Sequence, residues 1–377
     1  MAPVFSIILN NLTTHLHSRR SGSGSISSHW LNPKDFLALF TIIGGETVQR
    51  AVAQLSGHPS YVTPVAFSFG CLGYAINLSM NLALLQQGRF MPPPDCECII
   101  VNAQSRCIME NRSWILGRLV RDHRQHEKHP GGLTVTFYKT TKNDDNGRIQ
   151  GVPTLDWVYY SGIFVILLQL GIAVIPGAVD KDWRVFVVTA GGTMLSLLSG
   201  ALPKWRAEKW NGRRSYKDSD RTVVCLTRGS GYDDVIVIIS EGKDQYRLED
   251  IARTRYAPVA GTTAFTLILC IAEILLVTIL AAIDEHEWFM LGIGALGIVQ
   301  NAVAAGIRRD LGTTGIHLEE VGFPITDRKV MKTLQLAEER EPYVGIALVS
   351  IFFPGGLRPD EEAWRTDTLA RYKEGRL

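Results

Sequence analysis

Residues 259–283 read VAGTTAFTLILCIAEILLVTILAAI, and this stretch decides the fold class of the chain. It contains a single acidic or basic side chain, Glu273, near its middle. An α-helix rises about 1.5 Å per residue, so about 20 apolar residues cross the roughly 30 Å hydrocarbon layer of a bilayer. The stretch therefore predicts a transmembrane helix.

Similar apolar blocks recur along the chain. The clear ones lie at residues 61–85, 157–178, 183–203 and 287–307. A weaker block, residues 36–55, contains Glu46 and Arg50. Charged groups are costly inside a bilayer, so an amphipathic helix lying on the membrane surface is the alternative for this block. We expect an α-helical integral membrane protein with about six transmembrane helices.

The average composition hides this segregation of apolar and charged residues. The chain has 377 residues, of which 46% are hydrophobic and 20% charged. A net charge of +2 is too small to favour nucleic acid as a partner, and six cysteines do not make a disulfide scaffold. We expect the lipid bilayer as the main partner and no nucleic acid.

The blocks fall into pairs joined by short turns. We expect three helical hairpins, at residues 36–85, 157–203 and 259–307. Polar segments 86–156 and 204–258 and the tail 308–377 separate and follow them, and residues 1–35 are expected to be disordered. Lys and Arg are frequent where these segments meet the apolar blocks, whereas the short turns are acidic. The positive-inside rule then places the polar segments and both termini in the cytosol, at the endoplasmic reticulum or the plasma membrane.

The polar segments also carry patterns of regular structure. Residues 98–102, 133–139, 222–227 and 234–240 read as strands because they are rich in β-branched residues. Gly229 and Gly231 predict a turn between the last two. Residues 112–127 and 327–340 read as helices, and residues 343–353 as a buried core element or a membrane-surface segment. We expect these pieces to fold together as a small cytosolic α/β portion.

Glu273 is the most informative polar residue, because an ionisable group in mid-membrane is costly unless it is paired or hydrated. It is a candidate proton relay, cation ligand or general acid or base; the alternative is a structural contact between helices. Glu46 and Arg50 lie four residues apart, so they share a helix face and can pair. If their segment spans the membrane, the pair is expected to line an internal polar cavity with Glu273.

Cys96, Cys98 and Cys107 lie near His123 and His126 in the sequence, which raises the question of a metal site. Their C-x-C spacing differs from the C-x2-C of zinc ribbons, so free thiols on a polar surface are the favoured alternative. The sequence LGIGALG, with Gly292, Gly294 and Gly297, matches G-x-G-x-x-G inside an apolar block. Close helix packing explains these glycines better than nucleotide binding, and no cofactor is expected.

Several motifs carry a resemblance to a known family. They are GGETVQRAVAQLSG (44–57), MPPPDCECIIVNAQS (91–105), NRSWILGRLVRD (111–122), DWVYYSG (156–162) and SGALPKWRAEKW (199–210). Over roughly residues 36–310 the chain resembles a family of multi-pass membrane proteins of filamentous fungi, to which no reaction is attached. Members often accompany secondary-metabolite gene clusters. The resemblance implies an accessory or scaffold role in such a pathway; the alternatives are a small-molecule or ion transporter, or a membrane-embedded cyclase or isomerase that uses Glu273.

Overall fold

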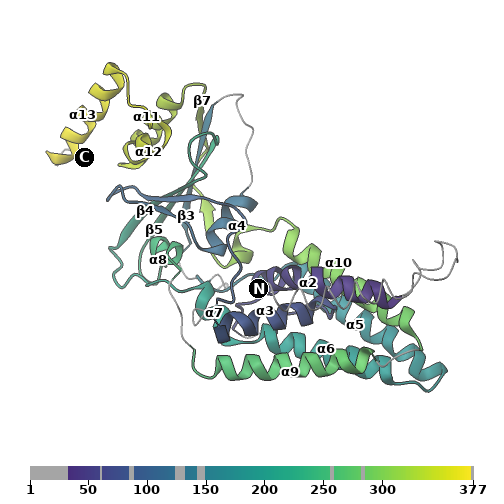
Figure 1. Cartoon of the computed structure of the whole chain (residues 1–377). Helices are drawn as coiled ribbons and strands as arrows, with labels where there is room; N and C mark the ends of the chain where they lie inside the picture. Colours follow the sequence, from purple (N-terminus) through teal and green to yellow (C-terminus); the bar gives the residue numbers. More distant parts are fainter. Residues whose placement is uncertain are drawn as a thin grey trace.

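The protein consists of a helical bundle with a sheet domain at one end (Figure 1). The computed structural model describes residues 33–59, 62–84, 89–123, 132–141, 149–254, 259–281 and 285–374. Most of the N-terminal segment that was expected to be disordered lies outside these ranges. Its last residues, 33–35, begin a helix instead.

The bundle contains six helices of the described chain arranged in a ring. They are α2 (Pro33–Leu55), α3 (Gly70–Leu84), α5 (Trp157–Val179), α6 (Arg184–Gly200), α9 (Thr262–Ala281) and α10 (Glu287–Gly306). Around the ring, α2 packs on α3, α3 on α9, α9 on α6, α6 on α5, α5 on α10, and α10 again on α2. Figure 1 shows the long helices running side by side away from the sheet domain.

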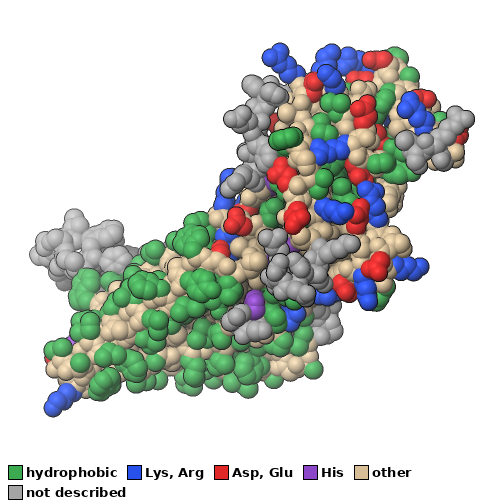
Figure 2. Space-filling view, turned by 180° about the vertical axis from the view of Figure 1, so that it is seen from behind, with side chains coloured by type: hydrophobic (Ala, Val, Ile, Leu, Met, Phe, Trp, Pro, Cys, Tyr) green, Lys and Arg blue, Asp and Glu red, His purple; other side chains and the backbone are tan. Residues whose placement is uncertain are grey.

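Four stretches of the described chain are long and apolar enough to cross a membrane. They are Trp157–Val179, Arg184–Lys209, Thr262–Leu280 and Glu287–Gly306. Their outward faces are apolar, with exposed side chains such as Phe164, Leu167, Ile268, Ile271 and Leu275. Figure 2 shows hydrophobic side chains covering the bundle, whereas Lys, Arg, Asp and Glu gather on the sheet domain. An exposed apolar surface of this extent is unfavourable in water and favourable in lipid, so the bundle is consistent with membrane association.

The prediction of one continuous span over residues 61–85 is wrong. Residues 62–69 form an extended, largely buried stretch, and only Gly70–Leu84, 15 residues, are helical. Pro64 lies in the extended stretch, and a proline disfavours helical geometry at the residue before it. Hydropathy measured how apolar these residues are, which reflects their burial, but it did not reveal the path of the backbone.

The sheet domain is built from all three polar segments, as predicted. Its sheet has the order β2-β1-β4-β5-β3-β6, with β7 also pairing with β3. The strands are β1 (Ile99–Asn102), β2 (Ile108–Glu110), β3 (Leu133–Thr140), β4 (Arg221–Thr227), β5 (Asp234–Glu241), β6 (Leu318–Glu320) and β7 (Ile325–Asp327). β3 and β5 are parallel and the other pairs are antiparallel. The predicted β4–β5 hairpin is confirmed.

Helices complete the domain. They are α4 (Trp114–Asp122), α7 (Pro203–Lys209), α8 (Leu248–Ala252), α11 (Val330–Arg340), α12 (Val344–Phe352) and α13 (Pro359–Lys373), with a short 3-10 turn at Leu311–Thr314. The expected helices at 112–127 and 327–340 correspond to α4 and α11. The segment 343–353 is a core helix, α12, which confirms the first of its two interpretations.

The two faces of the sheet belong to different cores. Val135, Val235 and Val237 face α11 and α12. The side chains that alternate with these along the strands, such as Ile236 and Ile238, lie on the other face of the sheet. They belong to one continuous core with α4 and the bundle helices. Successive residues of a strand point to opposite faces, so a single sheet contributes to both. The sheet domain is therefore packed against the bundle rather than tethered to it.

Candidate functional site

Buried basic side chains join the sheet domain to the ends of the bundle helices. Arg118 of α4 is fully buried and donates to Asp122 at 2.8 Å, to Asp95 at 3.0 Å and to the carbonyl oxygen of Ala305 at 2.7 Å. The last carbonyls of a helix lack partners within it, and the helix dipole makes that end negative. Arg118 therefore caps α10 from the sheet domain.

Lys209, at the end of α7, does the same for α2. Its Nζ donates to the carbonyl oxygens of Ala53 at 3.0 Å and Ser56 at 2.7 Å, and it lies 5.8 Å from the centre of the Trp114 ring. Only 2% of the lysine is exposed. Neither Arg118 nor Lys209 stood out in the sequence, because each bonds to a segment far away along the chain.

The extended stretch at residues 62–69 is held inside the ring by side chains of the surrounding helices. Gln169 of α5 donates to the carbonyl oxygen of Phe67 at 2.8 Å, and Asn301 of α10 donates to that of Ala66 at 3.0 Å. Tyr159 donates to the carbonyl oxygen of Val62 at 2.9 Å. Non-helical backbone at membrane depth requires such partners, since no water is available there.

Glycines let this stretch pass between the helices. A Cβ on Gly297 would lie 1.8 Å from the carbonyl oxygen of Phe67, and one on Gly294 would lie 1.9 Å from the Phe69 ring. Close packing is thus confirmed for both, whereas a Cβ on Gly292 would meet nothing within 4 Å, so the prediction is wrong for that residue.

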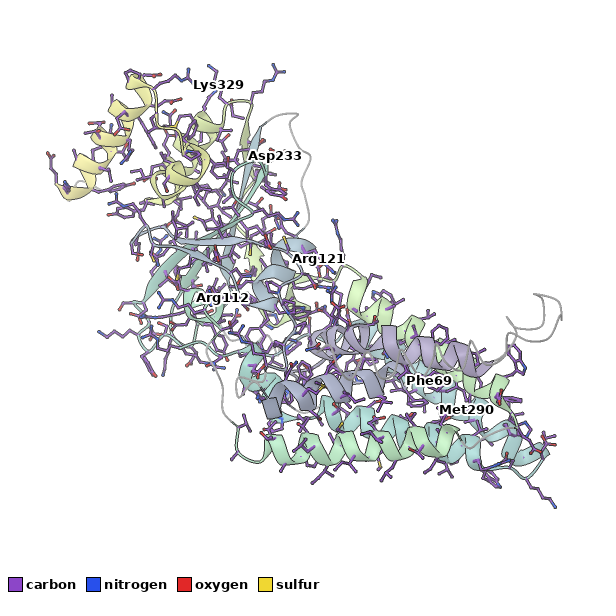
Figure 3. All side chains as sticks on the ribbon, viewed as in Figure 1. Phe69, Arg112, Arg121, Asp233, Met290 and Lys329 are labelled. Carbon is purple, nitrogen blue, oxygen red and sulfur yellow. The ribbon has the colours of Figure 1, made fainter. Side chains whose placement is uncertain are left out.

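The path of residues 62–84 begins and ends at the sheet-domain side of the bundle. Thr63 donates to the carbonyl oxygen of Gly200, where α6 ends next to that domain. From there the chain runs into the bundle, away from the sheet domain, to Phe69, which Figure 3 labels near Met290. There Gly70 packs against Gly44 of α2, and α3 runs back toward Phe90, whose backbone N–H donates to Glu208 at 2.7 Å. Residues 62–84 therefore form a hairpin that enters and leaves the bundle at the same end.

A cleft of about 700 Å³ opens at the junction of bundle and sheet domain. Its apolar lining includes Met91, Pro92, Pro94, Ile99 and Ile115. Its charged lining consists of Arg89, Arg112, Arg228, Lys209, Glu97, Glu110 and Glu208. Figure 3 shows Arg112 at the boundary between the two parts. Arg89, Arg112 and Arg228 belong to no pattern that would mark them in the sequence as site residues.

One polar atom of the residues lining this cleft lacks a hydrogen-bond partner among the described residues: Nε1 of Trp114 is buried without an acceptor. Oε1 of Glu208 is also buried, but it lies 3.6 Å from Nζ of Lys204, with which it forms an ion pair. A buried donor without a partner costs free energy, which a polar ligand group can recover. The cleft thus combines an apolar lining, basic groups and one donor available to a ligand.

Glu273 lies inside the bundle, in the middle of α9, and is 5% exposed. It lines a small cavity together with Cys71, Tyr74, Ser196 and Ser199. The cavity volume of about 10 Å³ is enough for one water-sized molecule. The cavity that Glu273 lines is therefore small, and apolar side chains such as Val48, Val65 and Leu195 form much of its wall.

The predicted neighbours of Glu273 are elsewhere. Arg50 pairs with Glu46 at 2.7 Å on the outer face of α2, with 41% and 69% of the two side chains exposed. The guanidinium also lies 3.8 Å from Asp95 of the sheet domain. The pairing itself is confirmed, but the prediction that the pair lines a cavity with Glu273 is wrong, because the inner face of α2 presents Val48 and Val52 instead.

The candidate metal ligands do not converge in the described part of the chain. Cys107 is exposed, Cys98 is buried, and His123 bonds the hydroxyl of Tyr138 at 3.3 Å. Burial raises the pKa of the Cys98 thiol to about 12, so without a bound metal this sulfur is a neutral thiol. Burial also raises the pKa of Cys96. His126 lies outside the described residues.

One trio among the described residues does bring potential ligands together. Asp182, Glu285 and His286 lie within 4.8 Å of one another at the far end of the bundle. Arg184 bonds Asp182 at 2.8 Å, and this bond holds the pKa of that carboxyl below its usual value. Of the trio only Glu285 is exposed, Asp182 and His286 are partly buried, and Arg184 already neutralises the two acids in part.

Comparison with known proteins gives no further guide to these sites. No protein-family model, no curated protein and no solved structure matches the chain.

Proposed function

We propose that the protein is a multi-pass membrane protein that binds an anionic amphiphile in the junction cleft. The described residues then cross the bilayer five times, through α2, α5, α6, α9 and α10, with residues 62–84 as a re-entrant hairpin. This is one crossing fewer than the six transmembrane helices expected from the sequence. Pro33, where α2 begins, then lies on the membrane face opposite the sheet domain.

Aromatic side chains support this placement. Trp157 and Tyr160 are exposed near the sheet-domain end of the bundle, and Trp183 and Trp288 are exposed at the far end. Tryptophan and tyrosine favour the two membrane–water interfaces. From the arginines and lysines near the junction and the positive-inside rule, we infer that the sheet domain lies in the cytosol, at the endoplasmic reticulum or the plasma membrane.

The observation that carries the proposed function is the composition of the junction cleft. It lies where the bundle leaves the membrane, so its position corresponds to the depth of lipid headgroups. Arg89, Arg112 and Arg228 offer donors to a carboxylate or phosphate, against the two exposed acids Glu97 and Glu110. The apolar lining accommodates the adjoining part of an acyl chain or ring system. A ligand of this class partitions into membranes and reaches the cleft laterally.

This binding role fits an accessory or scaffold component of a fungal secondary-metabolite pathway, which the resemblance in sequence implies. Many intermediates with an acidic group and an apolar skeleton concentrate in membranes. A protein that holds one at the cytosolic surface would present it to pathway enzymes without catalysing a step itself.

Photocrosslinking tests the cleft. The full chain in lipid nanodiscs is exposed to a diazirine-labelled fatty acid, with the corresponding fatty alcohol as the uncharged comparison, and crosslinked peptides are identified by mass spectrometry. We expect crosslinks at residues 91–97 and 110–115, and a loss of about tenfold in Arg112→Gln/Arg228→Gln, because a hydrogen bond to a charged group contributes about 1.5–3 kcal/mol. Arg365→Gln, on the remote helix α13, is the matched control. Equal crosslinking of acid and alcohol, or crosslinks spread over the bundle, would contradict the proposal.

The second candidate function, a transporter or a membrane-embedded cyclase or isomerase, is favoured by one observation. Glu273 is a buried carboxyl beside a cavity. Metabolite profiling after replacing the gene with Glu273→Gln separates the alternatives, provided that protein levels are unchanged. Accumulated intermediates would indicate an enzyme, retained final product a transporter, and an unchanged profile would exclude both.

A further inference from the structure

We propose that Glu273 is an intramembrane proton-binding site, assembled between α9, α6 and the re-entrant helix α3. This site is separate from the junction cleft and does not depend on the ligand proposed there. The proposal rests on the surroundings of the carboxyl, which differ from those of the other acidic side chains in the described chain.

Glu273 is only 5% exposed, yet it has no hydrogen bond or ion pair with any other described residue. The other buried acids have partners. Asp122, for example, accepts from Arg118, and Glu338 accepts from the backbone N–H of Ile346 at 3.0 Å. An unpartnered buried carboxylate is costly, whereas an unpartnered carboxylic acid costs far less.

The cavity also contains groups that stabilise the charged form. Cys71 lies in the first turn of α3, and its Sγ is 3.2 Å from Oγ of Ser196. The start of a helix carries partial positive charge, which favours a nearby carboxylate. The apolar neighbours Val48, Val52, Leu195 and Leu269 favour the acid. Because these two influences oppose each other, both protonation states of Glu273 are accessible.

The size and chemistry of the cavity favour a proton over other ligands. A volume of about 10 Å³ admits one water-sized molecule and excludes an organic substrate. Sodium takes several oxygen ligands at once, and a cavity of about 10 Å³ has no room for the ion together with the waters that would complete its coordination. The thiol of Cys71 is a poor ligand for a hard cation.

Few other titratable groups face this carboxyl. Cys71 and Tyr74 come from α3, and the cavity residues of α6 and α2 are not titratable. Cys270 lies one turn earlier on α9 and does not line the cavity. The Glu46–Arg50 pair lies on the outer face of α2. No charged side chain of the described residues therefore competes for the proton.

Infrared spectroscopy tests the site on the intact full chain in nanodiscs, because it needs no reagent to enter the cavity. A protonated carboxyl and a carboxylate absorb at different frequencies, and a carboxylic acid without hydrogen-bond partners is distinct from a hydrated one. We expect an acid band that falls at least tenfold between about pH 5 and about pH 9. Glu273→Gln should lack this band, whereas Glu46→Gln, which removes an exposed carboxyl paired with Arg50, is the matched control and should keep it.

The pH dependence is measured on the wild-type chain, so it does not require a variant to fold. A band that does not change with pH, or one that Glu273→Gln keeps, would overturn the proposal. Loss of the band on addition of sodium at constant pH would also overturn it, because it would show that the site binds a cation instead.

Discussion

Nε2 of Gln169 lies 2.8 Å from the carbonyl oxygen of Phe67, deep inside the bundle, where the chain is neither helix nor strand. The same amide also donates to the carbonyl oxygen of Ile293 at 2.8 Å. A single side chain thus ties the re-entrant hairpin to both α5 and α10. Backbone without regular structure persists at membrane depth only where protein groups satisfy it, so this contact is central to the topology proposed above.

Removing that amide is expected to destabilise the bundle. In Gln169→Met the carbonyl oxygen of Phe67 loses its donor, and an unsatisfied buried polar group costs about 1–3 kcal/mol. Thermal unfolding of the detergent-purified protein, followed by size-exclusion chromatography, should show a lower midpoint. Gln300→Met is the matched control, because Gln300 bonds only the side chain of Ser161 and supports no backbone of the hairpin. Equal loss in both variants would speak against a special role for Gln169.

Two glycines of α10 should respond in opposite ways to the same substitution. In Gly297→Ala the new methyl group would collide with the carbonyl oxygen of Phe67, so we expect a lower yield of folded protein. In Gly292→Ala the methyl group meets nothing within 4 Å, and alanine in a helix is more favourable than glycine by about 1 kcal/mol. Folded yield and midpoint temperature check both. If Gly297→Ala were as stable as Gly292→Ala, the hairpin would not pass where we describe it.

The junction should be sensitive to loss of the buried arginine. Arg118→Met leaves Asp122 and Asp95 without that partner and the carbonyl oxygen of Ala305, near the end of α10, without its donor. Breaking a buried ion pair costs about 3–5 kcal/mol, whereas a surface pair contributes about 0–1 kcal/mol. Arg365→Met, which removes an exposed pair with Glu362, is the control. Limited proteolysis should cut Arg118→Met rapidly between bundle and sheet domain. If Arg118→Met resisted proteolysis as well as Arg365→Met does, the role of Arg118 in joining α10 to the sheet domain would be contradicted.

The cysteines should differ in reactivity according to their burial. Cys107 is exposed and Cys96 partly so, whereas Cys98 and Cys225 are buried. Burial raises the pKa of Cys98 to about 12, so the reactive thiolate is scarce at neutral pH. Timed alkylation with mass spectrometry is expected to modify Cys107 first and Cys98 only on unfolding. Protection of Cys96, Cys98 and Cys107 together by zinc would instead restore the metal-site interpretation.

The sheet domain was predictable from sequence because its signals are local. The strands predicted at 133–139 and 234–240 are observed at Leu133–Thr140 and Asp234–Glu241. Runs of β-branched residues with turn glycines between them define such strands without knowledge of their partners. That the polar segments assemble into one sheet also followed from placing them on the same face of the membrane.

The re-entrant hairpin and the junction were not predictable in the same way. Hydropathy treats residues 61–85 as one apolar block, and Pro64 is the only local sign that the helix starts late. The partners that make the extended path stable, Gln169 and Asn301, lie in other helices. Arg118 likewise acts on Ala305, far along the chain. Such contacts depend on the tertiary structure, which a pattern in one segment does not contain.

One labelling experiment tests the re-entrant topology most directly. Single cysteines are introduced at the exposed positions Pro59, Arg112 and Lys181. The background chain has Cys96 and Cys107 replaced by serine. A membrane-impermeant maleimide is then added to sealed vesicles of known orientation. Because residues 62–84 return to the side from which they enter, Pro59→Cys should be labelled from the same side as Arg112→Cys and from the side opposite Lys181→Cys. If residues 61–85 crossed the bilayer as a full span, Pro59→Cys would be labelled together with Lys181→Cys, and that result would contradict the account.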